Sequence, residues 1–289
     1  MPALELLAAS PGLQGALVVL VGLAVGSFLN VVTLRVPRML EADWAAQCAE
    51  LRGETPPGRE PFNLMRPGSH CPACGAPILA RDNIPVLGWL LLRGRCRDCG
   101  TRISPRYPIV EGATAVLSLV TWWQLGWTAA GAAGLVLTWW LIVLTVIDLD
   151  HFLLPDNLTL PGLWLGLLLA LVPVFVGPAT AIAGAAAGYL VLWAVYHAFR
   201  LITGKEGMGY GDFKLLALLG AWLGWQMLPL VIIVSSFVGA AVGIALIAGL
   251  GRHRDQPIPF GPYLAAAGWV ALLWGDTLID AYLQFAGIT

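Results

Sequence analysis

Long apolar runs alternate with short polar segments along this chain of 289 residues. A helix needs about 20 predominantly apolar residues to cross the hydrocarbon core of a bilayer. Eight runs approach or exceed that length, and they cover residues 13–34, 109–125, 129–147, 158–176, 179–199, 213–225, 228–250 and 261–278. The sixth run is short and begins inside a glycine-rich turn. The pattern therefore predicts an all-α polytopic membrane protein with about eight transmembrane helices.

The composition excludes an ordinary soluble globular protein. Hydrophobic residues make up 58% of the chain and charged residues only 11%, and the mean hydropathy is +0.78. Soluble domains carry roughly a quarter charged residues. The net charge of −1 gives no indication of nucleic-acid binding. We expect a lipid bilayer as the surroundings of the chain and no nucleic-acid partner.

The basic residues indicate which way the helices cross the membrane. All Lys and Arg residues fall within segments 35–107, 200–214 and 251–255. With eight crossings, these segments share one side and both termini lie on the other. Cytoplasmic loops are enriched in Lys and Arg, so we expect the basic segments in the cytoplasm. Residues 1–12 contain no Lys or Arg, which favours an uncleaved first helix over a cleaved signal peptide.

Residues 35–107 form the only sizeable polar segment, and we expect a soluble module there. It opens with a polar, poorly periodic stretch at 41–60, which we predict to be a loop. Two CxxC pairs follow, and each is succeeded by a glycine that permits a tight turn. Paired CxxC turns at about this spacing are typical of a structural zinc site with four sulfur ligands. The four expected ligands are Cys71, Cys74, Cys96 and Cys99.

Two disulfides or four free thiols are the alternatives to a zinc site. The cytoplasmic placement argues against disulfides, because that compartment keeps thiols reduced. Cys48 lies outside the pattern and is expected to be a free cysteine.

Two aspartates lie at the expected cytoplasmic ends of apolar runs. Asp148 follows the run at 129–147, and Asp212 lies in the glycine-rich turn GMGYGDFK at 207–214. An acid at the membrane edge is costly without a partner or a function. The pair suggests an aspartyl protease, whose glycine turn lets an extended substrate approach the acids. The alternative for Asp212 is a helix N-cap, and an N-cap is also the role that we predict for Asp156.

Three further features leave their roles open. The segment GSFLN at 26–30 places an amide inside the first helix, where a helix-packing contact is the simpler interpretation. Glu111 either pairs with Arg106 or faces a cofactor. The loop QPIPFGPY at 256–263 either shapes the site or is a rigid turn.

Together, these motifs resemble the type IV prepilin leader peptidases, which are also N-methyltransferases and membrane aspartyl proteases of the GxGD type. The resemblance covers almost the whole chain. It rests on GSFLNVV at 26–32, both CxxC pairs, NIP at 83–85, LRGRC at 92–96, ISPRYPIVE at 103–111, Asp148 with LPD at 154–156, GYGDFK at 209–214 and PFGP at 259–262.

The resemblance implies a bifunctional enzyme of the bacterial inner membrane, with periplasmic termini. Such enzymes remove the basic leader of type IV prepilins, or of the pseudopilins of type II secretion, and then methylate the new N-terminus with S-adenosylmethionine. The resemblance assigns catalysis to Asp148 and Asp212. It also assigns the methyltransferase role to the cysteine module, with Gly94 and Glu111 as candidates for binding the cofactor. The residues expected to support the site are Gly209, Gly211, Lys214, Pro259, Phe260 and Gly261.

The resulting domain hypothesis has three parts. Residues 1–34 form the first helix, 35–107 the zinc-binding module inserted after it, and 108–289 a membrane peptidase domain of seven helices. A member with peptidase activity alone, a transporter that uses the acids as a cation site, and a non-enzymatic membrane adaptor are the alternatives. The sequence predicts no oligomeric state.

Overall fold

The computed structural model describes residues 10–55, 61–250 and 258–287. It divides into two compact units, residues 1–123 and 124–289. Within the described ranges the regular structure is helical, apart from two isolated β-bridges, His70–Pro77 and Arg95–Arg102. The prediction of an all-α fold is confirmed. Each of the eight apolar runs overlaps a helix, but the run at 158–176 extends beyond α6, which ends at Ala170.

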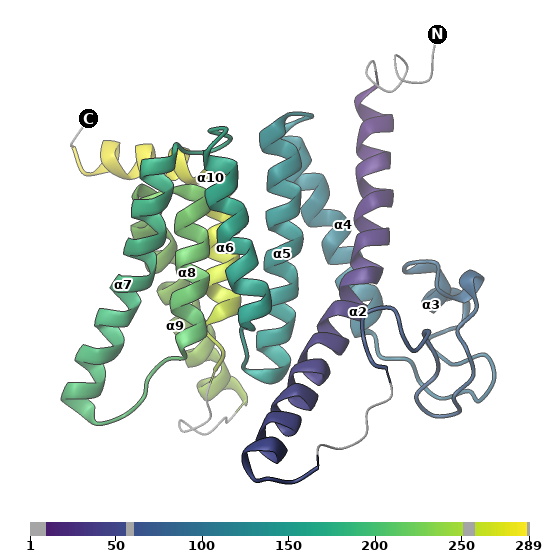
Figure 1. The fold of residues 1–289 in the computed structure, drawn as a ribbon. Helices are drawn as coiled ribbons and strands as arrows, with labels where there is room; N and C mark the ends of the chain where they lie inside the picture. Colours follow the sequence, from purple (N-terminus) through teal and green to yellow (C-terminus); the bar gives the residue numbers. More distant parts are fainter. Residues whose placement is uncertain (1–9, 56–60, 251–257, 288–289) are drawn as a thin grey trace. The chain divides into compact units, whose positions relative to one another are not determined.

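The first unit contains two long helices and a compact segment between them (Figure 1). The helices are α2 (Pro11–Leu51) and α4 (Arg106–Leu125). The segment between them carries a 3-10 turn, η1 (Ala80–Asp82), and a short helix, α3 (Leu87–Leu91).

The prediction of a loop at 41–60 is wrong for its first half, because α2 continues to Leu51. Residues 38–51 read RMLEADWAAQCAEL and are mostly strong helix formers, with no Gly or Pro until Gly53. They lack the apolar periodicity of a membrane helix, which is why the sequence suggested a loop. Pro37 lies inside the helix, and Figure 1 shows α2 bending near its middle, as expected where proline removes a backbone hydrogen bond. Residues 56–60 lie outside the described chain.

Close packing joins α2 to α4. A Cβ atom added to Gly22 or Gly26 would lie 2.7 Å from the Cα of Ala115 or Glu111, respectively. Small residues let helix backbones approach in this way. One turn beyond Gly26, Asn30 donates a hydrogen bond from Nδ2 to the carbonyl of Tyr107 at 3.1 Å. The GSFLN motif therefore makes the helix-packing contact predicted as its simpler interpretation.

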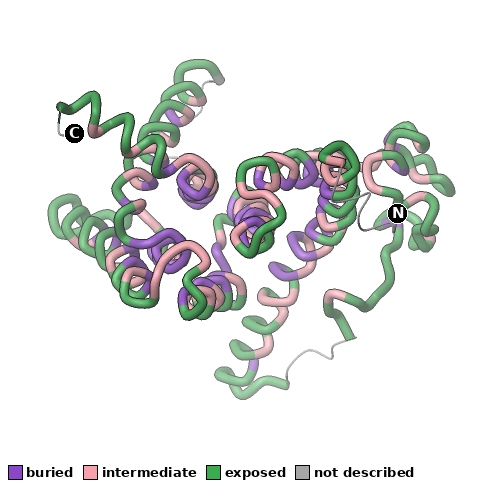
Figure 2. The backbone as a smooth tube through the Cα atoms, turned by 90° about the horizontal axis from the view of Figure 1, so that it is seen from above, coloured by how far each residue is buried: buried purple, intermediate pink, exposed green. Residues whose placement is uncertain are grey.

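The described residues of the second unit form six helices and one short 3-10 turn. They are α5 (Ala129–His151), α6 (Asp156–Ala170), α7 (Pro178–Thr203), α8 (Tyr210–Leu223), η2 (Trp225–Met227), α9 (Leu228–Leu250) and α10 (Gly261–Phe285). Figure 2 shows that buried positions lie on the sides of helices that face their neighbours, with exposed positions on the outer sides.

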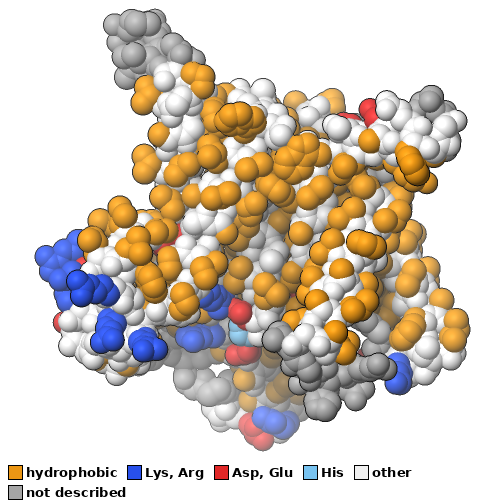
Figure 3. All heavy atoms as spheres, turned by 180° about the vertical axis from the view of Figure 1, so that it is seen from behind, with side chains coloured by type: hydrophobic (Ala, Val, Ile, Leu, Met, Phe, Trp, Pro, Cys, Tyr) orange, Lys and Arg blue, Asp and Glu red, His pale blue; other side chains and the backbone are white. Residues whose placement is uncertain are grey.

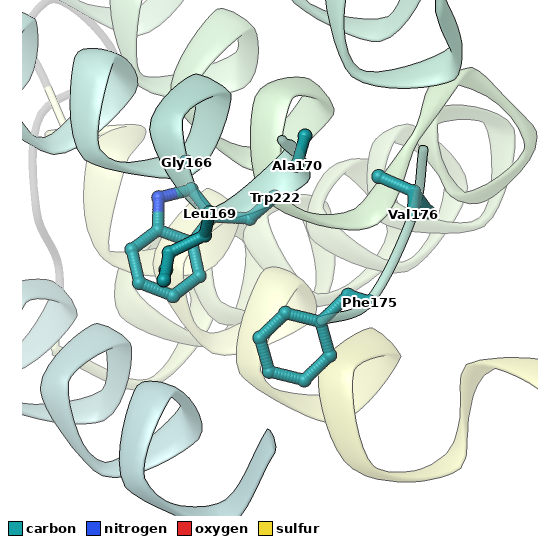
Figure 4. A pocket seen from close by; sticks show the side chains of 6 residues that line it. All are labelled: Gly166, Leu169, Ala170, Phe175, Val176 and Trp222. Atoms are coloured by element: carbon teal, nitrogen blue, oxygen red, sulfur yellow. The ribbon is translucent and has the colours of Figure 1, made fainter. Parts of the chain in front are cut away.

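Helix α8 forms the centre of this unit. Every residue from Leu215 to Leu223 is buried, so the sixth apolar run is surrounded by protein along most of its length. Gly220 of α8 meets Gly184 of α7 so closely that a Cβ on either would collide with the other backbone. Trp222 donates from Nε1 to the carbonyl of Gly162 at 2.9 Å. Figure 4 shows the hollow that Trp222 lines with Gly166, Leu169, Ala170, Phe175 and Val176, and this hollow leaves no room for a water molecule.

Five helices among the described residues are long and apolar enough to cross a membrane: α2, α5, α7, α9 (with η2) and α10. Large hydrophobic side chains are exposed along them, and Figure 3 shows such side chains covering the flanks of helices. The prediction of a membrane protein with several spanning helices is thus confirmed at this level.

Candidate active site and candidate metal centre

Asp148 lies on the last turn of α5, and its side chain is directed to the start of α10. It is buried, with 5% exposure. Its Oδ2 accepts a hydrogen bond of 3.0 Å from the backbone N–H of Gly261. Helix α5 ends three residues later, at His151, and Phe152 follows in a left-handed conformation (φ 53°). The chain therefore turns away just after delivering the carboxylate.

Asp212 lies in the first turn of α8, after the N-cap residue Gly209. It is also buried, with 6% exposure, and its backbone N–H donates to the carbonyl of Gly209 at 3.2 Å. Asp212 is therefore inside the helix and does not occupy the N-cap position. It lies near enough to Asp148 for the charges of the two side chains to interact. Two carboxylates that are 64 residues apart in sequence (212 − 148) thus meet in one site.

Leu154 connects the loops around the two acids. A Cβ on Gly211 would lie 2.7 Å from Cβ of Leu154, and a Cβ on Gly261 would lie 3.1 Å from its Cδ1. The same added atom on Gly261 would lie 2.6 Å from Asp148 Oδ2. Glycine is therefore required at both positions by close approach. The segments around 154, 211 and 261 converge on the acid pair.

Asp156 has a different role from the one predicted. It is the first residue of α6, the N-cap position is taken by Pro155, and no side chain caps this helix. Asp156 instead accepts from Nζ of Lys214 at 2.6 Å, so the prediction of an N-cap is wrong by one position. The ion pair links the start of α6 to α8.

The acid pair has the character of a proton-sharing site. Among the residues that the structure describes, no Lys or Arg forms an ion pair with Asp148 or Asp212. Two nearby carboxylates that are buried without a cation cannot both carry a negative charge at low cost. Such a pair holds one proton between its members, which is the arrangement that lets one acid accept a proton while the other donates a hydrogen bond.

The four predicted cysteines come together in the first unit. The Sγ atoms of Cys71, Cys74, Cys96 and Cys99 all lie within 4.8 Å of one another, a spacing that could hold a metal ion. Both glycines that follow the pairs have positive φ, 73° at Gly75 and 72° at Gly100, as the tight turns require.

The distance between two of the sulfur atoms fits a metal site and not a disulfide. Sγ of Cys71 and Sγ of Cys99 are 3.8 Å apart, far from the bonded distance of about 2.05 Å. Thr101 Oγ1 lies 3.2 Å from Cys99 Sγ. Cys48 is a free cysteine at the far end of α2, as predicted.

Gly94 and Glu111 lie in the same unit and each has a clear structural contact. Gly94 is buried at φ 65°, and a Cβ there would lie 2.8 Å from Cζ2 of Trp89. Glu111 is buried and accepts from the backbone N–H of Val86 at 2.7 Å. Val86 has φ 60°, a strained conformation for a β-branched residue. Glu111 thus fixes the strained residue that precedes α3.

Sequence reasoning missed several of these contacts. Nothing in the local sequence signals that Gly261 bonds to Asp148, because 113 residues separate them. Leu154 was part of a motif without an assigned role, although the position between Asp148 and the α6 start indicates a residue near the site. Val86 carries no local signal of a positive φ.

An all-helical chain with apolar spans, a buried carboxylate pair and a tetracysteine cluster has the features of a membrane-embedded aspartic peptidase with an added metal-binding module. Two family models match it. Residues 20–125 match the bacterial peptidase A24 N-terminal domain, and residues 135–244 match the type IV leader peptidase family.

Curated relatives match along nearly the full length. The prepilin leader peptidase/N-methyltransferase of Aeromonas hydrophila is 57% identical over 284 residues, which is 97% of each chain. The protein of the same name from Pseudomonas aeruginosa is 51% identical over 288 residues, 99% of each chain. That from Xanthomonas campestris pv. campestris is 45% identical over 283 residues, 96% of this chain and 97% of its own. No solved structure matches. The chain belongs to the type IV leader peptidase family.

Proposed function

We propose that this chain is a bifunctional membrane enzyme that cleaves the leader peptide of type IV prepilins and methylates the new N-terminal residue. The observation that carries the peptidase activity is the meeting of Asp148 and Asp212, both buried and without a counter-charge among the described residues. Family membership, with relatives of 45–57% identity that bear this double name, supports both activities.

In the cleavage step the two acids act as one unit. The ionised carboxylate takes a proton from a water molecule, whose oxygen adds to the scissile carbonyl. When the tetrahedral intermediate collapses, the C–N bond breaks and this proton passes to the leaving amine. The protonated carboxyl donates a hydrogen bond to the carbonyl oxygen and stabilises the developing negative charge. The Gly261 N–H is already bonded to Asp148 Oδ2, so it fixes the orientation of this carboxylate before the substrate arrives. The proton belongs to the pair and not to either residue alone.

The glycine turn before α8 supports access for an extended polypeptide. Gly209 and Gly211 flank Tyr210, which begins the helix carrying Asp212, and Lys214 of the same helix pairs with Asp156. The PFG segment at 259–261 leads into the N–H that contacts Asp148. These are the residues that we assign to the support of the active site.

All eight helices that coincide with apolar runs are proposed to span the inner membrane. At about 1.5 Å per residue, α8 with 14 residues and α6 with 15 are shorter than the hydrocarbon core. Helix α8 tolerates this because it is buried from Leu215 to Leu223, so its ends contact protein and not lipid. Helix α6 exposes Trp164 and Leu168 and relies on the apolar residues that follow it, up to 176, to complete the crossing. The basic segments then lie in the cytoplasm and the termini in the periplasm, which places the acid pair at the cytoplasmic edge.

The functional division that we propose is the one predicted from the sequence, with 1–34 as the first helix, 35–107 as the methyltransferase-associated zinc module and 108–289 as the peptidase domain. Four thiolates suit zinc, and tetrahedral bonds of about 2.3 Å place sulfurs about 3.8 Å apart, the separation of Cys71 and Cys99. Since no ligand position is left for substrate, the zinc role is structural.

For the methyl donor, the polar face between α2 and α4 offers suitable groups. The Oδ1 atom of buried Asn30 has no hydrogen-bond partner among the described residues, and Glu111 lies one helical turn away, against Gly26. A carboxylate and an amide oxygen suit the ammonium and hydroxyl groups of S-adenosylmethionine, whose sulfonium supplies an electrophilic methyl group. Gly94 influences this module because its backbone packs against the Trp89 side chain.

One assay tests both activities. The purified protein is incubated with S-adenosylmethionine and either a type IV prepilin or a type II secretion pseudopilin. The mass of the product is then measured by mass spectrometry. We expect loss of the leader followed by the added mass of one methyl group. Leader loss without methylation would show a peptidase alone. If the substrate is not cleaved, the peptidase activity is refuted, and a cation site becomes the alternative role for the two acids.

A further inference from the structure

A cavity in the second unit is lined by residues next in sequence to the segments that support the two acids. Its volume is about 300 Å³, and its lining includes Met208, Gly239, Ala240, Ile258, Phe260 and Tyr263. The lining comes from three parts of the second unit: the glycine turn before α8, the middle of α9, and the segment that leads into α10. Tyr263 lies against α9, since a Cβ on Gly239 would be 3.2 Å from its Cδ2.

Two residues of the cavity lining directly precede the residues that support the two acids. Phe260 directly precedes Gly261, whose N–H bonds to Asp148, and Met208 directly precedes Gly209, the N-cap of the helix that carries Asp212. Consecutive Cα atoms are about 3.8 Å apart. An extended polypeptide advances about 3.3 Å per residue. A substrate strand lying across the acids therefore places a side chain within one or two residues of the scissile bond at this cavity.

The chemistry of the lining selects an apolar side chain. None of the lining residues is charged, and only Ser236 and Tyr263 carry hydroxyl groups. A pocket of this kind gives neither a basic nor an acidic side chain a partner, and burial of such a group would be costly. Met208 adds an adaptable wall, because a thioether side chain adjusts to different apolar shapes.

We propose that this cavity is a specificity pocket that binds one apolar side chain of the polypeptide substrate, located within two residues of the cleaved bond. The inference rests on the proposed peptidase function. It adds that cleavage depends on the size of that side chain, and that the enzyme recognises it through α9 and the start of α10.

The test fills the cavity and compares the result with a matched surface change. Ala240 lines the cavity on α9, whereas its neighbour Ala241 is outside the lining, and both are exposed. The enzyme variants are Ala240→Leu and Ala241→Leu. The substrates are a prepilin and a series in which each apolar residue within two positions of the cleaved bond is replaced by alanine.

For the prepilin, we expect Ala240→Leu to lower kcat/KM by about 10- to 100-fold, mainly through KM, and Ala241→Leu to leave it unchanged. One alanine-substituted substrate should be cleaved equally by both variants, because its shortened side chain no longer competes for space with the introduced leucine. Equal cleavage of the prepilin by both variants would refute the proposal that the cavity binds a substrate side chain. So would an equal loss for all substrates, which would indicate another occupant, such as a lipid chain. Failure of the unmodified enzyme to cleave any prepilin would instead refute the proposed function.

Discussion

Replacing Gly261 by alanine tests the position of the Asp148 carboxylate without removing an acid. The added Cβ would lie 2.6 Å from Asp148 Oδ2 and 3.1 Å from Leu154 Cδ1, whereas ordinary contacts begin at 3.4 Å. One of the two groups must therefore move by about 0.8 Å (3.4 − 2.6). A displacement near 1 Å in an active site costs about 100-fold in rate. We expect Gly261→Ala to lower leader cleavage by about that factor.

The fold should tolerate this substitution. Overpacking by one methyl group costs about 1–3 kcal/mol. Gly112→Ala is the matched control, since no heavy atom lies within 4 Å of the added Cβ at that helical position. Cleavage rate and thermal stability are measured for both variants in detergent. Equal cleavage by Gly261→Ala and Gly112→Ala would refute the claim that Gly261 positions Asp148.

Three further predictions concern the parts around the site. Gly94→Leu, which meets Trp89 at positive φ, should lower methyl transfer to an already trimmed pilin far more than cleavage; an equal loss of both would indicate one shared site. Cys71→Ser should remove zinc, detected by elemental analysis of reduced protein, and zinc-free unmodified protein would contradict the metal assignment. Asp156→Asn should leave cleavage nearly unchanged, because its exposed ion pair with Lys214 is worth about 1 kcal/mol or less; loss of cleavage would give Asp156 a catalytic role.

The apolar runs predicted the helices because each run is long, uninterrupted by charge and bounded by Gly, Pro or polar residues. The same reasoning failed at 41–51, where Glu, Ala and Gln residues form a helix through their own propensity and without an apolar pattern. A polar extension of a membrane helix has no pattern that distinguishes it from a loop, although here it continues α2 to Leu51.

The cysteine cluster was predictable because ligand spacing and the following glycines are local signals. The contact between Gly261 and Asp148 was not, because it depends on how α5 and α10 pack. For the same reason the cavity lined by Met208, Ala240 and Phe260 could not be found in the sequence. Three distant segments form it, and none has a pattern of its own.

The central claim is that Asp148 and Asp212 form one catalytic unit, and single-turnover cleavage of a prepilin by Asp148→Asn, Asp212→Asn and the double variant tests it most directly. Methylation of a trimmed pilin serves as the control for folding. The account predicts that each single variant loses as much cleavage as the double variant, because members of one catalytic unit are not additive. Substantial cleavage by either single variant, with methylation intact, would contradict it.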